Sequence, residues 1–212
     1  FLIDLVEADA MVIHVNPLQE LLQVEGESDF KGLIKNIEKI CSKIKTPVIV
    51  KEVGSGISKR AAKKLLEAGV KGIDVSGAGG TSWAAVELIR GNKTDNYFQE
   101  WGLPTSYCVR RVKELKKDFD FTLISSGGIS NGVDIAKSIA LGADLTASAR
   151  VILQEIMKND VNGVVELINT WFSTVKRIMY LTGSKDIQDF KKVGLIRKEE
   201  LYWFLIPENL RE

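Results

Sequence analysis

The sequence predicts an α/β protein whose strands belong to a (β/α)8 TIM barrel. Five short apolar runs alternate with amphipathic helical patterns, and repeated βα units of this kind form a parallel sheet with right-handed crossovers. The last two runs open into Gly- or Ser-rich turns that enter helices, as in the barrel phosphate site after strands seven and eight. A full barrel takes ~250 residues, and the 212 residues here hold about five of its eight units. We therefore expect residues 1–212 to form a single domain, the C-terminal part of a barrel with about strands four to eight; a complete open five-stranded α/β domain is the alternative.

Each expected strand is short and rich in Val, Ile or Leu, as strands buried on both faces are. The five strands are Met11–Asn16, Val48–Val53, Gly72–Ser76, Phe121–Ser125 and Asp144–Ser148. Ser58 is expected to cap one helix, and Gly69 stands where a residue beyond a helix C-terminus belongs. The expected helices cover about residues 29–45, 59–68, 104–118 and 131–142, and after the last strand 161–181, 184–192 and 197–204.

Composition and charge exclude several function classes. Hydrophobic residues make up 45% of the chain, charged residues 27%, and the net charge is +1. No basic run exceeds two or three residues, and no apolar run approaches the ~18 residues that span a bilayer, so we expect no nucleic acid and no membrane as partner. Cys41 and Cys108 lack CxxC spacing, and acidic residues follow Phe1 at once, unlike a signal peptide. These features predict reduced thiols and a cytoplasmic location.

A Gly-rich turn over residues 77–80 organises the chain. Asp74-Val75-Ser76 leads into it, and a helical pattern from Trp83 to Ile89 follows. Three glycines within four residues let bare N–H groups approach an anion, and the helix N-terminus adds partial positive charge. An ordinary strand-to-helix turn is the alternative, but the adjacent Ser and Thr hydroxyls favour phosphate or cofactor binding.

Polar residues gather at the C-terminal ends of the expected strands, where barrel active sites are built. The densest group is His14-Val15-Asn16-Pro17-Leu18-Gln19-Glu20, in which His14 and Asn16 point to one side while Gln19 and Glu20 begin the following loop. A lone His is more often a packed core residue, yet four polar groups within seven residues favour a site. The group has no Ser/His/Asp arrangement and no metal-ligand spacing, so Glu20 would hold Mg²⁺ only where substrate phosphates supply further oxygens.

Three residues at later strand ends have two interpretations each. Lys51 ends a buried strand while Glu52 points to the opposite face by strand alternation, which favours a ligand role for Lys51. Asp74 shares a face with Ser76 and either serves a site or accepts backbone hydrogen bonds. Trp83 either packs or covers an apolar substrate tail.

Five stretches of the chain share their order and sequence with one enzyme family. His14–Glu20 with Gly26-Glu27…Phe30 matches the pattern HxNPxQE…GxxxF. The other four stretches are Lys51–Ser58, Asp74–Trp83, Trp101–Thr105 and Ser126–Ile129. Together they resemble type 2 isopentenyl diphosphate isomerase over about residues 7–190. NPxQE combined with DVSGxGGTSW is highly specific, whereas SGGI is common to many FMN barrels.

The resemblance implies an FMN-dependent (β/α)8 enzyme that interconverts isopentenyl and dimethylallyl diphosphates. The reaction is redox-neutral but needs reduced FMN, with NAD(P)H as reductant and Mg²⁺ on the substrate diphosphate. In the chemistry proposed for the family, the flavin moves a proton on and off the allylic system. No side chain here is an evident acid strong enough to protonate an unactivated alkene, so the cofactor takes the difficult step. The resemblance also implies a homo-oligomer.

Individual roles follow from the same resemblance. Gln19 would be the catalytic residue beside the alkene, and Glu20 would be the metal ligand. His14, Asn16 and Trp83 would bind substrate together with Gln19. The residues expected to bind FMN are Lys51 at the pyrimidine edge, where a cation stabilises the anionic reduced form, Ser76, Thr81, Gly127, Gly128, Ala147 and Ser148. Glu87 is expected just behind this set.

Two departures from the family pattern affect FMN binding. The family commonly places Arg after SGG(I/V), and Ser130 occupies that position here. A backbone amide cradle can still hold a phosphate, but one charge-assisted contact is lost, so we expect lower FMN affinity unless an Arg from elsewhere substitutes. The N-terminal strands and their flavin contacts are absent, so the fragment alone is expected to be a poor enzyme.

Two rival functions differ in the residues they require. Another FMN-dependent TIM-barrel oxidoreductase, of the 2-hydroxy-acid oxidase or dihydroorotate dehydrogenase kind, needs a catalytic His or Cys on a late strand, and the only His is His14 on the first. A silent flavin- or phosphate-binding subunit completed by a separate chain has no use for Gln19 and Glu20. Both comparisons favour the isomerase.

Overall fold

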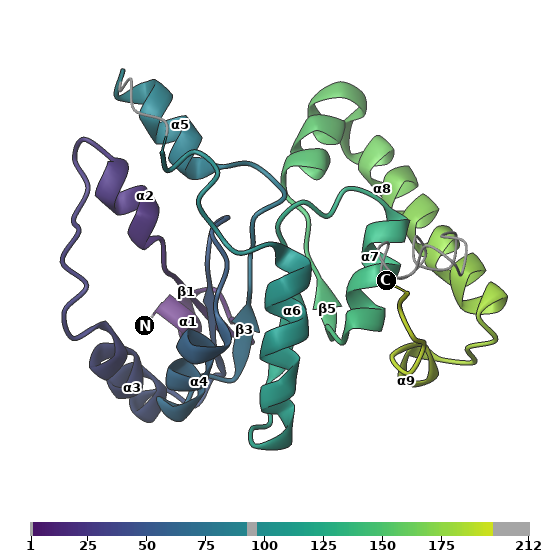
Figure 1. Ribbon diagram of the computed structural model, residues 1–212, viewed down its shortest axis with the longest axis horizontal. Coiled ribbons are helices and arrows are strands. Elements are labelled where there is room, and N and C mark those ends of the chain that lie inside the picture. The colour runs from purple at the N-terminus through teal and green to yellow at the C-terminus, as the bar shows by residue number, and fades with distance from the viewer. Residues whose placement is uncertain (1, 93–96, 197–212) are drawn as a thin grey trace, which may run out of the picture.

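A computed structural model describes residues 2–92 and 97–196 of the chain (Figure 1). Its centre is a parallel five-stranded sheet in the order β1-β2-β3-β4-β5. The strands are β1 (Met11–His14), β2 (Val48–Lys51), β3 (Gly72–Asp74), β4 (Thr122–Ser125) and β5 (Leu145–Thr146). All five expected strands are therefore present, each shorter than its apolar run: β1, β2 and β3 end earlier, β4 begins one residue later, and β5 is shorter at both ends.

The strand order distinguishes an arc of a barrel from a doubly wound open sheet. A doubly wound sheet reverses its strand order at a switch point. Here each strand pairs in parallel with the next one along the chain, without reversal. The sheet is thus an arc of a (β/α)8 barrel, and the C-terminal ends of its strands all lie on one edge.

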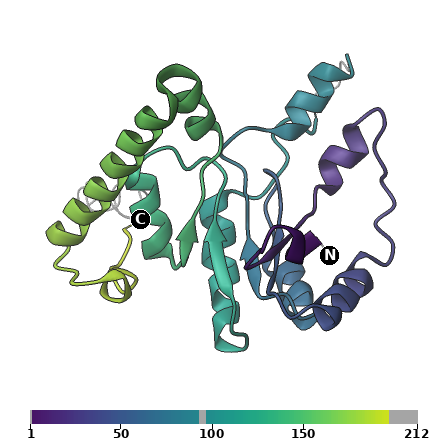
Figure 2. The same ribbon diagram turned by 180° about the vertical axis from the view of Figure 1, so that it is seen from behind.

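The helices of the βα units cover one face of the sheet. These helices are α3 (Leu33–Lys43), α4 (Lys59–Glu67), α6 (Thr105–Lys113) and α7 (Gly132–Leu141). Helices α4 and α6 lie in front of the sheet in Figure 1 and behind it in Figure 2. The main core forms between strands and helices and contains Val50, Ile73, Val109 and Leu123, all fully buried.

The opposite face of the sheet is less covered at β2 and β4, so the expectation of strands buried on both faces holds for β3 but is wrong for these two. Burial alternates along β2, where Val48 and Val50 are buried and the two residues beside them are only half-buried. Strand β4 shows the same alternation. Val and Ile suit a buried position on either face, so apolar composition alone did not reveal that the helices lie on one side.

Helix ends agree well with the sequence signals. The Ser58 side chain accepts a hydrogen bond from the Ala61 amide at the start of α4. Asn131 Oδ1 accepts from two amides at the start of α7, and Gly142 ends that helix with φ +113°. Helix α3 begins at Leu33 rather than near residue 29, and the expected 104–118 helix is α6 followed by a 3-10 turn, η1 (Glu114–Lys117).

Helix α8 (Arg150–Leu181) is interrupted, because Asn159 and Asp160 have non-helical backbone angles. Asp160 Oδ1 accepts from the Asn162 amide at 2.7 Å and so caps the second half, whose extent matches the expected helix over 161–181. The first half, from Arg150, was expected only as a helix entry after β5. Helix α9 (Ile187–Phe190) is shorter than the expected 184–192 segment. The expected helix over 197–204 lies outside the described residues.

Three short helices complete the described chain: α1 (Leu2–Leu5), α2 (Pro17–Leu22) and α5 (Trp83–Arg90). The sequence predicted α5 but placed Gln19 and Glu20 at the start of a loop, which is wrong because both belong to α2. Pro17 stands in the first turn of α2, where its missing N–H leaves no helical hydrogen bond unmade. Helices α2 and α5 stand together beyond the C-terminal edge of the sheet (Figure 1).

The N-terminal edge of the sheet is held by an ion-pair group centred on Asp144. Its carboxylate accepts from the Leu123 amide at 2.8 Å and pairs with Lys116 and with Lys191, the latter at 2.6 Å. Burial by itself would raise the pKa of Asp144, but these donors outweigh it and hold that pKa below its usual value. The group ties η1, β5 and the segment after α9 together.

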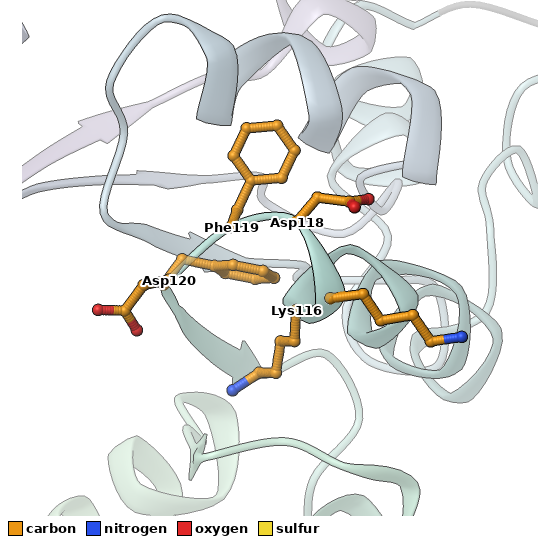
Figure 3. A pocket seen from close by; sticks show the side chains of 6 residues that line it. Lys116, Asp118, Phe119 and Asp120 are labelled. Atoms are coloured by element: carbon orange, nitrogen blue, oxygen red, sulfur yellow. The ribbon is translucent and has the colours of Figure 1, made fainter.

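A shallow hollow of about 400 Å³ lies beside this group, lined by residues 116–121. In Figure 3, Phe119 points toward the neighbouring helix, while the side chains of Lys116 and Asp120 extend away from that helix. The hollow opens before β4 begins, at the opposite end of the strand from the polar residues discussed below. Among the described residues, no helix is long and apolar enough to cross a membrane.

Candidate functional site

The C-terminal edge of the sheet brings the expected site residues into one row. Register pairs His14 with Lys51, and Lys51 with Asp74. Ser126 Oγ then donates to Asp74 Oδ1 at 2.6 Å from the end of β4. The polar residues at the ends of the first four strands therefore lie along one edge of the sheet, and which of them bind a ligand stays a prediction.

The side-chain amide of Gln19, on α2, is held by hydrogen bonds at both its nitrogen and its oxygen. Gln19 Nε2 donates to Glu87 Oε1 at 2.9 Å, and Gln19 Oε1 accepts from Asn16 Nδ2 at 3.3 Å. The Glu87 side chain comes from α5 and is buried, with only 5% of its surface exposed. Sequence reasoning put Glu87 near the site without a partner, and the structure makes it the direct partner of Gln19.

Glu20 lies one position along α2 and binds the following loop. Its Oε1 accepts from Asn16 at 3.0 Å, and its Oε2 accepts from the Glu27 amide at 3.0 Å. Within residues 2–92 and 97–196, no three His, Cys, Asp or Glu side chains are grouped to hold a metal ion. A cation at Glu20 would therefore need oxygens from a ligand, as the sequence also implied.

Glu52 has a structural role that the sequence analysis missed. Its Oε2 accepts from the amides of residues 53–56 at 2.5–3.3 Å, so the carboxylate organises the loop after β2. The expectation that Glu52 does not pair with Lys51 is confirmed. A buried acidic residue followed by a short Gly- and Ser-containing loop was the available signal, because such a loop can turn successive amides toward one anion.

Lys51 is half-buried and donates from Nζ to the Glu52 carbonyl at 2.7 Å. Its charge also acts on Asp74, the next residue in register. Burial raises the pKa of Asp74, while the hydrogen bond from Ser126 and the charge of Lys51 oppose that shift. Asp74 Oδ1 further accepts from the Ser76 amide at 3.2 Å, so its interpretation as an acceptor of backbone hydrogen bonds is confirmed, while its service in a site stays a prediction.

Ser76 adopts φ +35°, an unusual backbone angle for a residue with a side chain. Such strain costs of order 1–3 kcal/mol and persists where the surroundings fix the conformation. Here the Asp74 carboxylate holds the Ser76 amide, and the Ser126 carbonyl accepts from the next amide at 3.1 Å. Strain at this point sets the direction in which the Gly-rich turn leaves β3.

The two Gly-rich turns pack directly against each other. A Cβ on Gly127 would stand 2.1 Å from the Gly77 carbonyl oxygen, and one on Gly128 would stand 2.5 Å from that of Gly79. Close packing of the turns therefore requires these glycines, so their number alone is not evidence of an anion site. The sequence could not separate the two causes, since the contact joins residues about 50 positions apart.

Thr105, the first residue of α6, joins both turns. Its Oγ1 lies 2.7 Å from the Gly127 carbonyl and 3.0 Å from that of Ser126, and its amide donates to the Ala78 carbonyl at 3.1 Å. Thr105 ends the sequence motif Trp101–Thr105, which by itself did not reveal a role for this residue. The residue fixes the spacing between the ends of β3 and β4.

Free amides remain at the ends of β4 and β5. Within the described residues, the N–H groups of Gly128 and Ile129 have no hydrogen-bond acceptor, and no side chain caps the N-terminus of α8. Ser148 Oγ donates to the Ile129 carbonyl at 2.7 Å and so holds the two strand ends together. This arrangement fits a phosphate, because backbone amides and a helix N-terminus attract anions.

Ser130 does not take the place of the Arg that the resemblance leads one to expect. Its hydroxyl and amide both bind the Asp134 carboxylate, at 3.0 and 3.1 Å. The side chain therefore serves the start of α7 instead of the amide cradle. Gly128, Ala147 and Ala149 are exposed around the cradle.

Three remaining candidates are exposed at this edge of the sheet: His14, Thr81 and Trp83. Trp83, with 43% of its surface exposed, begins α5 without being part of a core cluster, which favours the covering interpretation over packing. Part of the connection between residues 91 and 102 lies outside the described residues. Its described end is held by a hydrogen bond from Ser82 Oγ to the Gln99 carbonyl at 2.7 Å.

Residues 23–197 match the family of FMN-dependent dehydrogenases, which is most of the chain. The chain belongs to that family. FMN as the cofactor of this family and the barrel architecture predicted from the sequence are thereby both supported.

Curated relatives refine the likeness within the family. The chain is 42% identical over 211 residues to an isopentenyl-diphosphate delta-isomerase of Chlorobium limicola, covering 93% of this chain and 58% of that protein. It is 38% identical over 201 residues to the isopentenyl-diphosphate delta-isomerase of Pyrococcus furiosus, covering 92% and 50%. The predicted resemblance is confirmed. The chain spans little more than half the length of these relatives.

Solved structures agree on the fold. A putative lactate oxidase of Pediococcus acidilactici superimposes with a TM-score of 0.68 at 18% identity, over 91% of this chain and 55% of that one. A mandelate oxidase superimposes with a TM-score of 0.57 at 19% identity, over 76% and 43%. At these identities the likeness concerns the barrel architecture alone.

Proposed function

We propose that this chain is the C-terminal part of an FMN- and Mg²⁺-dependent isomerase that interconverts isopentenyl and dimethylallyl diphosphates. The observation that carries the proposal is the doubly held amide of Gln19, fixed by Asn16 and Glu87 on the same sheet edge as the amide cradle of β4 and β5. The names of relatives that are 38–42% identical to the chain support the same activity.

The chain's own residues divide the work between two ends of the substrate. Glu20 would hold Mg²⁺ on the diphosphate, with His14 and Asn16 beside it, since carboxylates bind Mg²⁺ well when phosphate oxygens complete the coordination. Gln19 would orient the alkene and assist proton transfer, and Trp83 would cover the apolar tail. The transposition gains one proton at the terminal alkene carbon and loses one from an allylic carbon, so it is redox-neutral.

The cofactor would lie along the ends of the later strands. Lys51 would face the pyrimidine edge, Ser76 and Thr81 would contact the ring system, and Gly127, Gly128, Ala147 and Ser148 would surround the phosphate. Reduced FMN, when bound, supplies the acid and base that the described side chains lack. Holding this group in a fixed position beside the substrate is what the protein adds.

Completion of the barrel belongs to the same proposal. Strands β1 and β5 each have one partner in the described sheet, and an eight-stranded barrel closes such edges with three further βα units. We infer that units preceding β1 supply them, together with further flavin contacts. The proposal also includes reduction of FMN by NAD(P)H, a homo-oligomeric assembly and a cytoplasmic location.

The test uses the protein at the full length of its relatives, with FMN and Mg²⁺. Isopentenyl diphosphate is followed by NMR in deuterated water, with and without dithionite. Deuterated dimethylallyl diphosphate that forms only with reduced flavin is the expected result. Bound FMN without isomerisation under reducing conditions would overturn the proposal and favour a flavin oxidoreductase; absence of flavin binding would favour a silent subunit.

A further inference from the structure

Arg90, the last residue of α5, makes two ion pairs that join the candidate site to a loop of acidic character. Its NH1 lies 3.5 Å from Glu87 Oε2, and its NH2 lies 2.7 Å from Glu25 Oε1. Glu87 is the buried carboxylate that binds Gln19, whereas Glu25 belongs to the loop of residues 23–32. One guanidinium therefore contacts both the partner of Gln19 and the loop after α2.

Glu25, one of the two ion-pair partners of Arg90, also lines an acidic hollow. A hollow of about 460 Å³ lies under the 23–32 loop and is lined by Glu20, Glu25, Glu27 and Asp29, with Lys31 as the cation among its lining residues. Neighbouring carboxylates repel one another, and a cation paired with one of them reduces that repulsion. Within the described residues, Arg90 is the cation paired with Glu25 and with the buried Glu87.

A buried carboxylate is stable in its ionised form only when it is paired or hydrogen-bonded. Glu87 has two side-chain partners among the described residues, the Gln19 amide and Arg90. Arg suits this position because its planar fork can bind two carboxylates at once, which the single ammonium of Lys cannot reproduce. Arg90 thus holds one oxygen of the Glu87 carboxylate, Oε2, while the other, Oε1, accepts from the Gln19 N–H.

We propose that Arg90 is a positioning residue, which clasps the 23–32 loop onto α5 and, through Glu87, fixes the orientation of the Gln19 amide. The catalytic part of this inference rests on the proposed isomerase function. The clasp itself does not, because it concerns contacts within the protein. Removing Arg90 leaves Glu87 buried without its cation and frees the loop that binds Glu20 through the Glu27 amide.

The first experiment measures isomerisation by Arg90→Met in the full-length, FMN-loaded, reduced protein. We expect kcat to fall about tenfold, equivalent to roughly 1.4 kcal/mol, with FMN absorbance unchanged. Arg90→Lys should recover part of the rate. Arg60→Met is the matched control, because Arg60 is exposed on α4 and makes no ion pair or side-chain hydrogen bond in the described structure.

A double-mutant cycle separates positioning from loss of stability. In a Gln19→Ala background, Arg90→Met should lower kcat no further, since the amide that Arg90 positions is gone. A merely structural role would lower the rate to the same extent in both backgrounds. An Arg90→Met enzyme with wild-type kcat, or with equal losses in both backgrounds, would overturn the inference while leaving the isomerase function intact.

Hydrogen exchange tests the clasp without any assay of activity. Amides of the 23–32 loop, including the Glu27 amide bound to Glu20, should exchange several-fold faster in Arg90→Met and in Glu25→Gln than in wild type or Arg60→Met. Unchanged exchange would refute the clasp. If wild-type protein does not isomerise the substrate, the proposed function fails, and this measurement alone decides whether Arg90 holds the loop.

Discussion

Replacement of Thr105 by Val tests whether one hydroxyl holds the ends of β3 and β4 together. The two side chains have nearly the same shape, so the change removes the hydroxyl and little else. In the structure, Oγ1 lies 2.7 Å from the Gly127 carbonyl and 3.0 Å from the Ser126 carbonyl, and Thr105 is buried with 8% of its surface exposed. Loss of the hydroxyl leaves the Gly127 carbonyl without this donor, while the Ser126 carbonyl keeps the hydrogen bond from the Gly77 amide.

The magnitude follows from this geometry. A single O–H is shared between two acceptors, so one net hydrogen bond of about 1 kcal/mol is lost, and desolvation of an unpaired carbonyl adds about 1 kcal/mol. We expect Thr105→Val to lower the free energy of unfolding by about 2 kcal/mol. For a chain of 212 residues this corresponds to a fall in Tm of about 4–8 °C. Because the turns carry the amide cradle, FMN affinity should fall as well.

Urea unfolding followed by circular dichroism, together with flavin titration, measures both effects. Thr105→Ser is the matched control, since it keeps the hydroxyl and loses only a methyl group. Thr105→Ser should retain FMN affinity, and its midpoint should stay closer to wild type than that of Thr105→Val. If the two variants were equally stable and bound FMN equally well, the hydroxyl would not be what joins the turns.

Three further predictions follow from other parts of the structure. Gln19→Ala should reduce turnover by at least a hundredfold while FMN remains bound, as measured by NMR and flavin absorbance; an unchanged rate would remove Gln19 from the mechanism. The pKa of Asp144 is lower in the folded protein than its unfolded value of about 3.9. The ionised carboxylate therefore stabilises the fold above pH about 3.9, and this stabilisation is lost as the pH falls through the pKa of the folded protein. Asp144→Asn should therefore lower the free energy of unfolding by about 1–2 kcal/mol at pH 7. Between pH 5 and pH 3, roughly the range over which Asp titrates, the variant should lose less stability than wild type. Identical acid unfolding profiles of the two proteins would contradict the role of Asp144. Burial raises the pKa of Cys108 to about 11 and that of Cys41 by a smaller amount. Iodoacetamide at about pH 8, where free thiols are partly ionised, should therefore modify Cys41 first, as mass spectrometry of the native protein can check. Faster labelling of Cys108 would be inconsistent with its position in the core.

The sequence by itself determined the order and type of the main elements. Short apolar runs separated by amphipathic helical stretches predicted five parallel strands, and the cap residues Ser58, Asn131 and Gly142 located helix ends because capping is a local property of the chain. Spacing of polar groups at strand ends predicted one site edge, since parallel strands present all their C-terminal ends together. These inferences need only neighbouring residues and the geometry of a βα unit.

Tertiary structure decided what depends on contacts between distant residues. Glu87 binds Gln19, which lies 68 residues away in the sequence, and Gly77 contacts Gly127, which lies 50 residues away. No local sequence pattern reports on contacts at such separations. Helix α2 was missed because its six residues are too few for a periodic signal, and the one-sided cover of the sheet was missed because Val and Ile suit either face. Local propensity therefore gave the elements and their order, whereas packing assigned Gln19, Glu52 and Thr105 the partners that define the site.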